Sequence, residues 1–468
     1  MNLQLRPEAA RPEPVGRRRY VILALITIVL AFSTGDRATL SVAGPNIQSS
    51  LGINAVEMGW LFSAFAWAYV VGHLPAGWLV DRFGAKSVVV VALTLWSIVT
   101  LMMSGVGWVA QPFAALLLLR VLLGALEAPV GPASARIIAA WFPAAERGVA
   151  GAIFNSAQYL SLVIFTPLMG WLDHVWGWHH IFTVMGFLGL LLALVWGRLY
   201  FVPLRHPALT RKERDYIEAG GGLIDLGAVK KDASGGTPPG PTLGDIGMLF
   251  RSRMLVGIFI AQYCITAITW FFVSWFPTYL VTALGLSMLK AGFIAALPAV
   301  CGCVGGVTTG FFSDWLLRRT GSLTIARKVP ITIGLVLSAS IIACNYVRTD
   351  WMIVALMSLA FFGKGFGSLG WTVVADTAPK RVIGLTGGVF NAIGNTAGIV
   401  TPLIIGYILA GTGSFSGALL FVGLHGLVAI LSYWLIVGPI ERFDIGDGSG
   451  NRKAIEVPAH ERIARSLP

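Results

Sequence analysis

The sequence predicts an all-α polytopic membrane protein with twelve transmembrane helices, and three observations support this. Of its 468 residues, 56% are hydrophobic and only 12% are charged, which is about half the charged share of a soluble domain. The mean hydropathy of +0.76 suits a chain whose surface faces lipid. Apolar stretches of about 20 residues, the length that crosses a hydrocarbon core of about 30 Å, recur from end to end. A water-soluble fold and a single membrane anchor are both excluded.

Each stretch is expected to be a helix, because the runs are continuously apolar with scattered Gly and Pro and lack the alternation of a barrel strand. A cleavable signal peptide is not expected, since the basic residues 17–19 precede a span that is too long for a signal sequence and has no small-residue cleavage site. The expected spans cover residues 20–43, 57–80, 87–106, 111–138, 147–171, 179–201, 253–281, 289–313, 329–347, 351–375, 383–410 and 416–438.

Lys and Arg are concentrated in the amino-terminal tail and in every second loop after it, whereas the intervening loops contain only Lys290 and Arg348. Positively charged loops stay in the cytoplasm, so both termini and the central loop are expected on that side of the membrane. The net charge of +12 is thereby explained by topology, and no nucleic-acid partner is expected. The expected segments are a cytoplasmic tail at 1–19, a six-helix bundle at 20–201, a cytoplasmic linker at 202–250, a second six-helix bundle at 251–438 and a cytoplasmic tail at 439–468.

The two halves carry an internal duplication. Residues 77–86 and 310–319 share a Gly and an Asp at matching positions, and their aspartates, Asp81 and Asp314, are 233 positions apart. A second pair, residues 151–155 and 387–391, ends in asparagines that are 236 positions apart. Two motif pairs at nearly one offset indicate parallel halves, which in one class of transporters place the binding site between them near the membrane midplane.

The motif G-x-L-x-D-R-x-G-x-K at residues 77–86 resembles the signature of the major facilitator superfamily, and the resemblance implies that fold. Its short loop suits tight helix packing and a charge latch between the two bundles. We therefore assign Asp81, Arg82 and Asp314 to gating. The alternative is an ordinary charged cap beside a glycine packing site.

Further strings resemble the anion:cation symporter family, and most of all its glucarate and galactarate carriers. The resemblance implies proton-coupled import of sugar diacids by alternating access. A proton symporter of a monocarboxylate sugar acid, such as galactonate or a hexuronate, is the alternative, and a transporter-like sensor is a third reading. The strings that carry the resemblance are residues 35–40, 62–69, 140–148, 154–159 and 262–264.

A handful of ionisable residues inside the apolar spans need an explanation, namely Asp36, Arg37, Arg120, Glu127 and Lys364. Each costs on the order of 2.5 to 3.5 kcal/mol at mid-membrane, so such residues normally face a cavity, pair with one another and mark a substrate or ion path. Ion pairing with a purely structural role is the alternative.

Arg120 and Glu127 are seven positions apart, which places them on one helical face about 10.5 Å apart along the axis. Because side chains lean toward the amino terminus, Glu127 is expected to lean toward Arg120. Glu127 is therefore the first candidate for the proton carrier, with Arg120 coupled to it. Asp36 and Arg37 are adjacent, about 100° apart around the helix, and must point in different directions. The resemblance to galactonate carriers implies protonation sites at Asp36 and Glu127 and anion binding at Arg37.

Lys364 lies in the second half of the chain and Arg37 in the first. We hypothesise that these two cations bind opposite carboxylates of an aldarate and draw the bundles together. The alternative is that Lys364 extends its ammonium group to the membrane interface.

Sugar hydroxyls require neutral hydrogen-bonding side chains at the same depth. The resemblance aligns Gln158 and Asn391 with substrate-contacting positions, and the indole of Trp371 could stack on the C–H face of a sugar. The full set of candidates is Tyr69, Gln158, Tyr159, Gln262, Trp371, Thr372, Asn391 and Asn395.

Catalytic and metal-binding motifs are missing from the sequence. It contains no H-E-x-x-H, G-x-S-x-G or Walker pattern, and its seven histidines are not spaced as ligands. We therefore expect no enzyme, no metal site and no cofactor, with protons as the coupling ion. A monomer in the lipid bilayer, with a small sugar-acid anion as substrate, is the expected working form.

Overall fold

The computed structural model describes residues 16–225, 243–379 and 382–442, and every regular element in these ranges is a helix. Twelve helices or consecutive helix pairs among them are long and apolar enough to cross a membrane. The predicted fold class is confirmed. Most of both expected tails and the middle of the expected linker lie outside the described residues.

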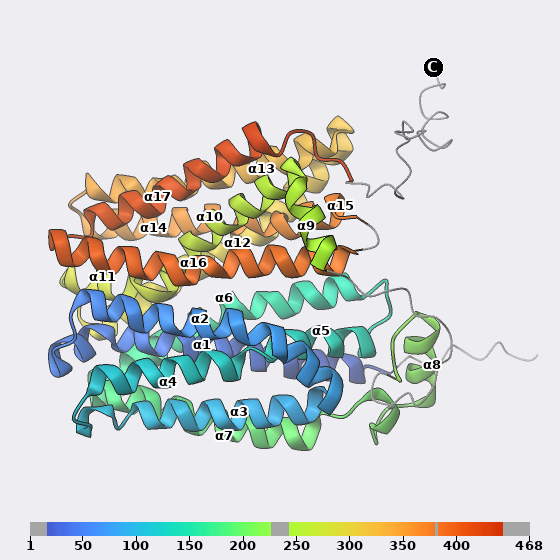
Figure 1. Ribbon diagram of the computed structural model, residues 1–468, viewed down its shortest axis with the longest axis horizontal. Coiled ribbons are helices and arrows are strands. Elements are labelled where there is room, and N and C mark those ends of the chain that lie inside the picture. The colour runs from blue at the N-terminus through green and yellow to red at the C-terminus, as the bar shows by residue number, and fades with distance from the viewer. Residues whose placement is uncertain (1–15, 226–242, 380–381, 443–468) are drawn as a thin grey trace, which may run out of the picture.

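The first bundle occupies the lower half of Figure 1 and the second bundle the upper half. The first consists of α1 (Arg18–Leu51), α2 (Ala55–Phe83), α3 (Ala85–Met103), α4 (Pro112–Glu127), α5 (Val130–Trp141), α6 (Arg147–Trp176) and α7 (Trp178–Leu199). The second consists of α10 (Arg253–Ser274), α11 (Phe276–Thr282), α12 (Met288–Thr320), α13 (Leu323–Ser338), α14 (Asp350–Gly365), α15 (Leu369–Thr377), α16 (Ile383–Thr412) and α17 (Ser416–Leu431).

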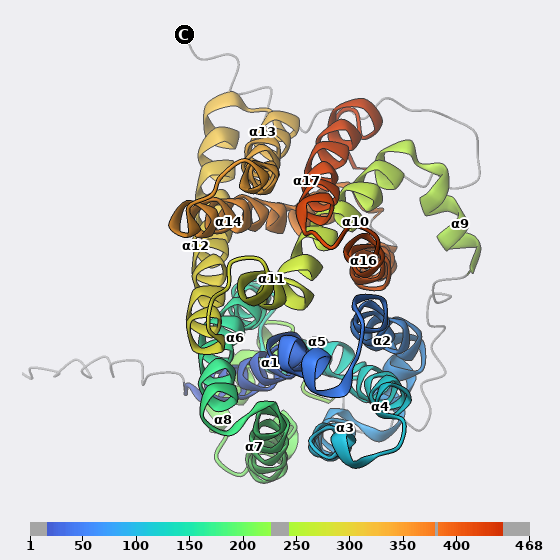
Figure 2. The ribbon, with the colours of Figure 1, turned by 90° about the vertical axis from the view of Figure 1, so that its left-hand side faces the viewer.

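Two short helices, α8 (Arg211–Ala219) and α9 (Leu243–Arg251), lie at one end of the molecule, on the right in Figure 1. We call this the α8 end and the opposite one the far end. Figure 2 views the molecule from the far end, where α11 packs against α1.

Local residues determine the turn between α1 and α2 at the far end. Gly52 ends α1 with φ of +67°, a left-handed conformation that glycine adopts without strain. The side chain of Asn54 accepts a hydrogen bond from the backbone N–H of Glu57, whose carboxylate accepts one from the N–H of Asn54, both at 2.9 Å. This capping box satisfies two N–H groups at the start of α2.

The fourth helical span of each bundle is broken, although the sequence predicted a single span in both places and indicated a loosened helix only in the first, at Gly124 and residues 129–132. In the first bundle α4 ends at Glu127 and α5 begins at Val130, beside Pro129. Proline removes a backbone donor and interrupts a helix. In the second bundle, the 3₁₀ turn Phe366–Ser368 separates α14 from α15. The matching breaks agree with the duplication, and each lies next to an ionisable residue, Glu127 or Lys364.

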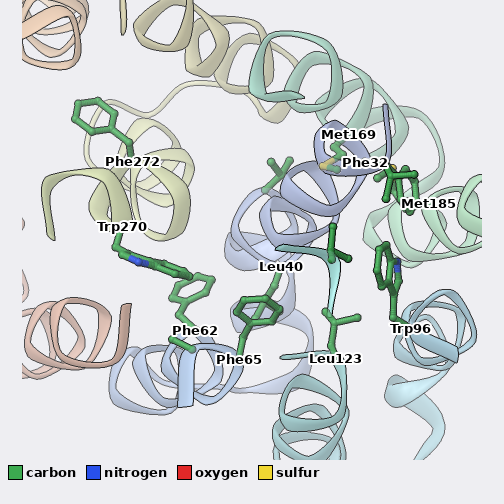
Figure 3. Packing of buried hydrophobic residues seen from close by; sticks show 14 of the residues in the cluster. Phe32, Leu40, Phe62, Phe65, Trp96, Leu123, Met169, Met185, Trp270 and Phe272 are labelled. Atoms are coloured by element: carbon green, nitrogen blue, oxygen red, sulfur yellow. The ribbon is translucent and has the colours of Figure 1, made fainter. Parts of the chain in front are cut away.

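One hydrophobic cluster runs from the first bundle into the second. Figure 3 shows Trp270 of α10 beside Phe62 of α2, with Phe65 close by. The ring of Phe65 lies 6.5 Å from that of Trp270, and Phe62 packs edge-on against Trp275 at 5.3 Å. The bundles therefore share an apolar seam in this region.

Glycines bring the two bundles into backbone contact at the far end. A Cβ built on Gly59 of α2 would lie 2.8 Å from the carbonyl oxygen of Pro402 in α16. A Cβ on Gly292 of α12 would lie 2.7 Å from the carbonyl oxygen of Thr166 and 2.9 Å from the Cα of Gly170, both in α6. Side chains larger than hydrogen would separate these helices.

Glycines near the α8 end have different surroundings. A Cβ on Gly77, Gly151, Gly310 or Gly388 would meet no heavy atom within 4 Å. These glycines belong to the duplicated motifs of α2, α6, α12 and α16. The bundles are thus in backbone contact at the far end, and these four motif glycines make no such contact near the α8 end.

Substituting valine for Gly292 is expected to weaken the far-end closure, because its side chain would collide with the backbone of α6. Overpacking of this kind costs about 1–3 kcal/mol, enough to shift the conformational equilibrium at least about fivefold toward closure of the α8 end. The measurement is the labelling rate of a cysteine introduced at the exposed Ser156, in a background without the four native cysteines.

Gly310→Val is the matched control, since it adds the same side chain to the same helix where a Cβ meets nothing. Labelling at position 156 should fall with Gly292→Val and stay unchanged with Gly310→Val. Equal rates in the two variants would mean that the Gly292 contact does not set the conformation.

Helix α8 is fastened to the first bundle by a buried ion-pair network. The carboxylate of Glu213, fully buried, accepts hydrogen bonds from the backbone N–H groups of Arg18 and Arg19 at 3.1 Å each. Arg19 also pairs with Glu213 at 3.3 Å and with Glu146 at 2.9 Å. Tyr216 donates to Glu146 at 2.6 Å. The start of the expected linker is therefore a structural part of the first bundle.

Glu146 lies just before α6 and stays ionised in this network. Burial alone would raise the pKa of Glu146, but the hydrogen bonds from Tyr216 and Arg19 and the charge of Arg19 outweigh it. The pKa of Glu146 therefore lies below its usual range. A lowered carboxyl pKa contributes stability at neutral pH that is lost as the pH falls through that pKa.

Glu213→Ala is expected to destabilise the protein by about 2 kcal/mol, because it leaves Arg19 with one carboxylate and two backbone N–H groups without an acceptor. Thermal unfolding in detergent should show a lower Tm. Glu218→Ala, on the exposed side of the same helix, should leave the Tm unchanged. Equal Tm values for the two variants would show that α8 does not depend on this network.

Candidate functional site

Asp36 and Arg37 point in different directions, as their spacing on the helix predicts. The Asp36 side chain is fully buried and accepts a hydrogen bond from the hydroxyl of Thr100 in α3 at 2.8 Å. Arg37 turns toward α4, where its Nε lies 2.9 Å from Oε2 of Glu127. The two neighbouring side chains thus contact different helices of the bundle, α3 and α4.

Glu127 occupies the last position of α4, directly before the break in the fourth span. It is fully buried, and Ser33 of α1 donates to the same oxygen, Oε2, at 2.7 Å. Within the described residues, Oε1 of Glu127 and Oδ1 of Asp36 have no hydrogen-bond partner. Each carboxylate therefore presents one oxygen that can take up a proton without breaking an existing hydrogen bond.

Arg120 does not make the ion pair with Glu127 that the helical spacing predicted. Its Nε donates to the carbonyl oxygen of Leu61 at 3.2 Å, and its guanidinium lies 5.1 Å from the ring centre of Phe65. In the described part of the chain, the salt bridge of Glu127 is with Arg37. Two helical turns separate Arg120 from Glu127, whereas Arg37 approaches from the neighbouring helix α1. The partner from another helix is nearer than the partner on the same one.

Aromatic rings of α2 hold the Arg37 guanidinium from the other side. It lies 4.5 Å from the ring centre of Tyr69 and 5.0 Å from that of Phe65. Tyr69 and Phe65 are themselves stacked at 5.5 Å. Arg37 is thus clamped between a carboxylate and two π faces, with 16% of its side chain exposed. A cation in such a setting is kept at a defined position.

Lys364 lies at the end of α14 and faces the other bundle. Its Nζ is 3.4 Å from the hydroxyl of Tyr159 in α6, and it lies 5.1 Å from the ring centres of Tyr159 and Phe361. No carboxylate of the described residues lies within ion-pair distance of it. This place at the seam between the bundles differs from the alternative in which Lys364 extends to the membrane interface.

The remaining candidates of the second bundle lie on three neighbouring helices. Gln262 of α10 is half-buried and donates to Thr266, and its side chain contacts α16 at Gly394. Trp371 of α15 is exposed and packs edge-on against Phe390 of α16 at 5.0 Å. Asn391 accepts a hydrogen bond from Asn395, one turn along α16, at 3.1 Å. Thr372, next to Trp371, is half-buried.

Gln158 lies on α6 directly before Tyr159 and is exposed. Consecutive residues of a helix point about 100° apart. Gln158 therefore points in a different direction from Tyr159. The structure brings Arg37 and Tyr69 together in the first bundle and Gln262, Trp371 and Asn391 close together in the second.

The gating candidates lie at the α8 end, and Asp81 forms its ion pair inside its own bundle. It pairs with Arg136 of α5, whereas a latch between the bundles was expected. Arg82 stacks on Trp78, with its guanidinium 5.2 Å from the indole centre. Asp314 is exposed. In this conformation the motif joins α2 to α5 and does not bridge the two bundles.

The second bundle has its own ion pair at the α8 end, between Arg327 of α13 and Asp376 of α15 at 2.9 Å. Arg327 also donates to Ser313, the neighbour of Asp314, at 2.7 Å. The sequence reasoning missed Arg136, Arg327 and Asp376. A charge inside a predicted apolar span could have revealed Arg136, which lies within residues 111–138.

Ser33 and Thr100 were also missed, and the sequence contains no signal for them. Hydroxyl side chains are common in membrane helices, where they usually bond to backbone carbonyls of the preceding turn. Only the tertiary structure shows that Ser33 donates to Glu127 of α4 and that Thr100 of α3 donates to Asp36.

Comparison with known proteins adds three findings. Residues 26–402 match the model of a family described as Major Facilitator Superfamily. The chain is 52% identical over 438 residues to the probable galactarate/D-glucarate transporter GudP of Escherichia coli strain K12, covering 92% of this chain and 96% of that protein. It is 51% identical over 445 residues to the protein of the same name from Bacillus subtilis strain 168, covering 94% and 96%.

Among solved structures, the chain resembles a bacterial homologue of the human lysosomal transporter Spinster in an inward-facing and occupied conformation. The TM-score is 0.68 at 16% identity, with 90% of this chain and 97% of that chain covered. At this identity the likeness shows the fold alone.

Proposed function

Because the chain belongs to the major facilitator superfamily, a family of multi-pass membrane transporters, we propose that it is a proton-coupled symporter that imports sugar diacids such as galactarate and D-glucarate by alternating access. The single observation that carries the proposal is the position of two cations, Arg37 and Lys364, in opposite bundles within the membrane-spanning region. The printed names of relatives about half identical to this chain support the choice of substrate.

The two cations suit a substrate with a carboxylate at each end. Arg37 belongs to the first bundle, and Lys364 belongs to the second and has no carboxylate partner among the described residues. A dianion that binds both would draw the bundles together around itself. A monocarboxylate would leave one cation without its anion, which is unfavourable in the membrane interior.

The hydroxyl groups of the sugar chain would bind the neutral side chains around these cations. Tyr69 lies against Arg37 in the first bundle, and Gln158 is accessible on α6. In the second bundle the exposed indole of Trp371 offers an apolar face for sugar C–H groups, and Gln262, Thr372 and Asn391 supply donors and acceptors.

Proton coupling follows from the ion pair between Arg37 and Glu127. While Glu127 is ionised it occupies Arg37, and a substrate carboxylate must compete with it. A proton on Glu127 removes the negative charge and frees Arg37 for substrate. Asp36 is the second proton carrier, and Arg120 lies between α4 and α2 as a fixed positive charge near them. Protonation and substrate binding thereby favour each other.

Two carriers would make the cycle electroneutral. Importing a dianion against an inside-negative potential costs about 2.3 kcal/mol for each charge per 100 mV. Two protons moving with the dianion cancel this cost and leave the pH gradient as the driving force. Voltage-clamped proteoliposomes should therefore show no sizeable inward positive current when substrate is added.

The working form is a monomer in the bacterial inner membrane, with both termini in the cytoplasm and no cofactor besides protons. The basic loops assign the α8 end to the cytoplasm, so the closed far end would face the periplasm. The pairs Asp81–Arg136 and Arg327–Asp376 would rearrange when the α8 end closes, together with Arg82 and Asp314.

Uptake driven by a pH gradient in proteoliposomes tests the function. Vesicles with an imposed pH gradient receive labelled glucarate, and unlabelled galactarate, galactonate or glucuronate competes for uptake. We expect accumulation that depends on the gradient and that galactarate inhibits more strongly than either monoacid. Accumulation without a gradient would contradict symport, and stronger inhibition by galactonate or glucuronate would favour a monocarboxylate carrier. Binding without accumulation would indicate a sensor.

A further inference from the structure

Tyr159 occupies the seam where α6 meets the second bundle. A Cβ on Gly302 of α12 would lie 3.0 Å from Cε1 of Tyr159. The Tyr159 ring packs edge-on against Phe361 of α14 at 6.2 Å, and its hydroxyl lies 3.4 Å from Nζ of Lys364. A single side chain of the first bundle thus touches two helices of the second.

The Tyr159 hydroxyl is the oxygen acceptor that the described structure gives to Lys364. The ammonium group otherwise lies against the faces of Tyr159 and Phe361. Arg37 differs, because the ionised Glu127 balances its charge. A cation in the membrane interior that loses its last polar partner becomes costly to keep there.

A symporter switches its site from one side of the membrane to the other in two forms, one with bound substrate and one without. Exchange of labelled for unlabelled substrate needs only the loaded form, whereas net uptake also needs the return of the carrier without substrate. During that return Lys364 has no substrate carboxylate to bind. Any group that satisfies the ammonium in that step will speed net uptake and leave exchange unaffected.

We propose that Tyr159 is a positioning residue that takes the place of the substrate's second carboxylate on Lys364 while the carrier returns unloaded. This inference rests on the proposed function. The tyrosine hydroxyl is neutral and its hydrogen bond is long, so the dianion displaces it readily. Release of the substrate lets the hydroxyl return to the ammonium, which stays satisfied throughout the cycle.

Tyr159→Phe removes the hydroxyl and keeps the ring that packs on Lys364 and Phe361. In proteoliposomes, we expect net galactarate uptake driven by a pH gradient to fall about tenfold, the effect of losing one hydrogen bond to a charged group. Galactarate exchange at equal concentrations should stay within about twofold, with an apparent KM equal to or below that of the unmodified protein, because the competing hydroxyl is gone.

Tyr263→Phe is the matched control. It removes a hydroxyl from a half-buried tyrosine of α10 that packs near His425, 5.9 Å between ring centres, and it should leave the ratio of net uptake to exchange unchanged. A second measurement uses galactonate in a Lys364→Asn background. There Tyr159→Phe should no longer alter the ratio, because the ammonium that it serves is gone.

The outcomes separate this inference from the proposed function. Failure of the unmodified protein to exchange galactarate would refute the function. Normal exchange with an unchanged ratio in Tyr159→Phe would refute the role of Tyr159. An equal loss of net uptake and exchange would also refute it and make Tyr159 a substrate ligand. A loss that persists in the Lys364→Asn background would show that Tyr159 acts through some other group.

Discussion

Glu127→Gln is expected to abolish proton-driven accumulation of substrate while leaving exchange largely intact. Glutamine keeps the shape of the side chain and can still accept a hydrogen bond from Ser33, which donates to Glu127 at 2.7 Å. It cannot release or bind a proton, and it no longer balances the charge of Arg37. The variant resembles the protonated carrier permanently, so substrate can bind and exchange. The concentration gradient that the vesicles build should fall by at least about 100-fold, which corresponds to about 2.7 kcal/mol of lost coupling.

The measurement compares gradient-driven uptake with equilibrium exchange in the same vesicles. Glu218→Gln, which removes a carboxylate from the exposed side of α8, serves as the control and should retain both activities. If Glu127→Gln loses exchange and substrate binding as well, Glu127 recognises the substrate and the proton must be carried elsewhere, with Asp36 as the next candidate.

Lys364→Asn is expected to reduce glucarate uptake far more than galactonate uptake. The substitution removes the cation that would hold the second carboxylate and leaves a polar side chain near Tyr159. Truncating one partner of a buried charge pair costs about 2–5 kcal/mol, so the apparent affinity for glucarate should fall at least about 30-fold. Galactonate has no second carboxylate to lose, and its apparent affinity should change by less than about threefold, the factor that about 0.6 kcal/mol gives.

Both affinities can be measured by competition against one labelled substrate. Lys290→Asn provides the control, since it removes an exposed lysine near the far end of α12. It should leave the ratio of glucarate to galactonate affinity unchanged. Equal losses of the two substrates in Lys364→Asn would contradict the two-cation model, and the discrimination between diacid and monoacid would then lie in the neutral residues.

Much of the fold could be predicted because its signals are local. A membrane helix must form its backbone hydrogen bonds within itself and present apolar side chains to lipid over about 20 residues. Each span can therefore be recognised from one continuous segment of the sequence. The glycine and prolines around Glu127 indicated a loosened helix there, whereas the break at Phe366–Ser368 was not predicted. Proline or glycine occurs in many of the spans, and the neighbouring helices decide which of these sites interrupt a helix.

The site was predictable in its parts but not in its pairings. A charged residue inside an apolar span is energetically costly to place in the membrane, so it is conspicuous in the sequence. Asp36, Glu127 and Lys364 could therefore be identified as site candidates from the sequence. Helical spacing then favoured Arg120 as the partner of Glu127, whereas the salt bridge of Glu127 in the described residues is with another arginine. The partner is Arg37, 90 positions away along the chain, and Tyr159 lies 205 positions from Lys364.

The amino-acid sequence by itself determined that this protein is embedded in the lipid bilayer, crosses it twelve times and repeats one six-helix bundle. Hydropathy and motif spacing can be read without knowing which residues are in contact. Only the tertiary structure decided which carboxylate holds Arg37, that Lys364 reaches the opposite bundle, and that Asp81 pairs within its own bundle with Arg136. The physical reason is that an ion pair depends on distances of a few ångströms between helices, and those distances are set by how the helices pack against one another.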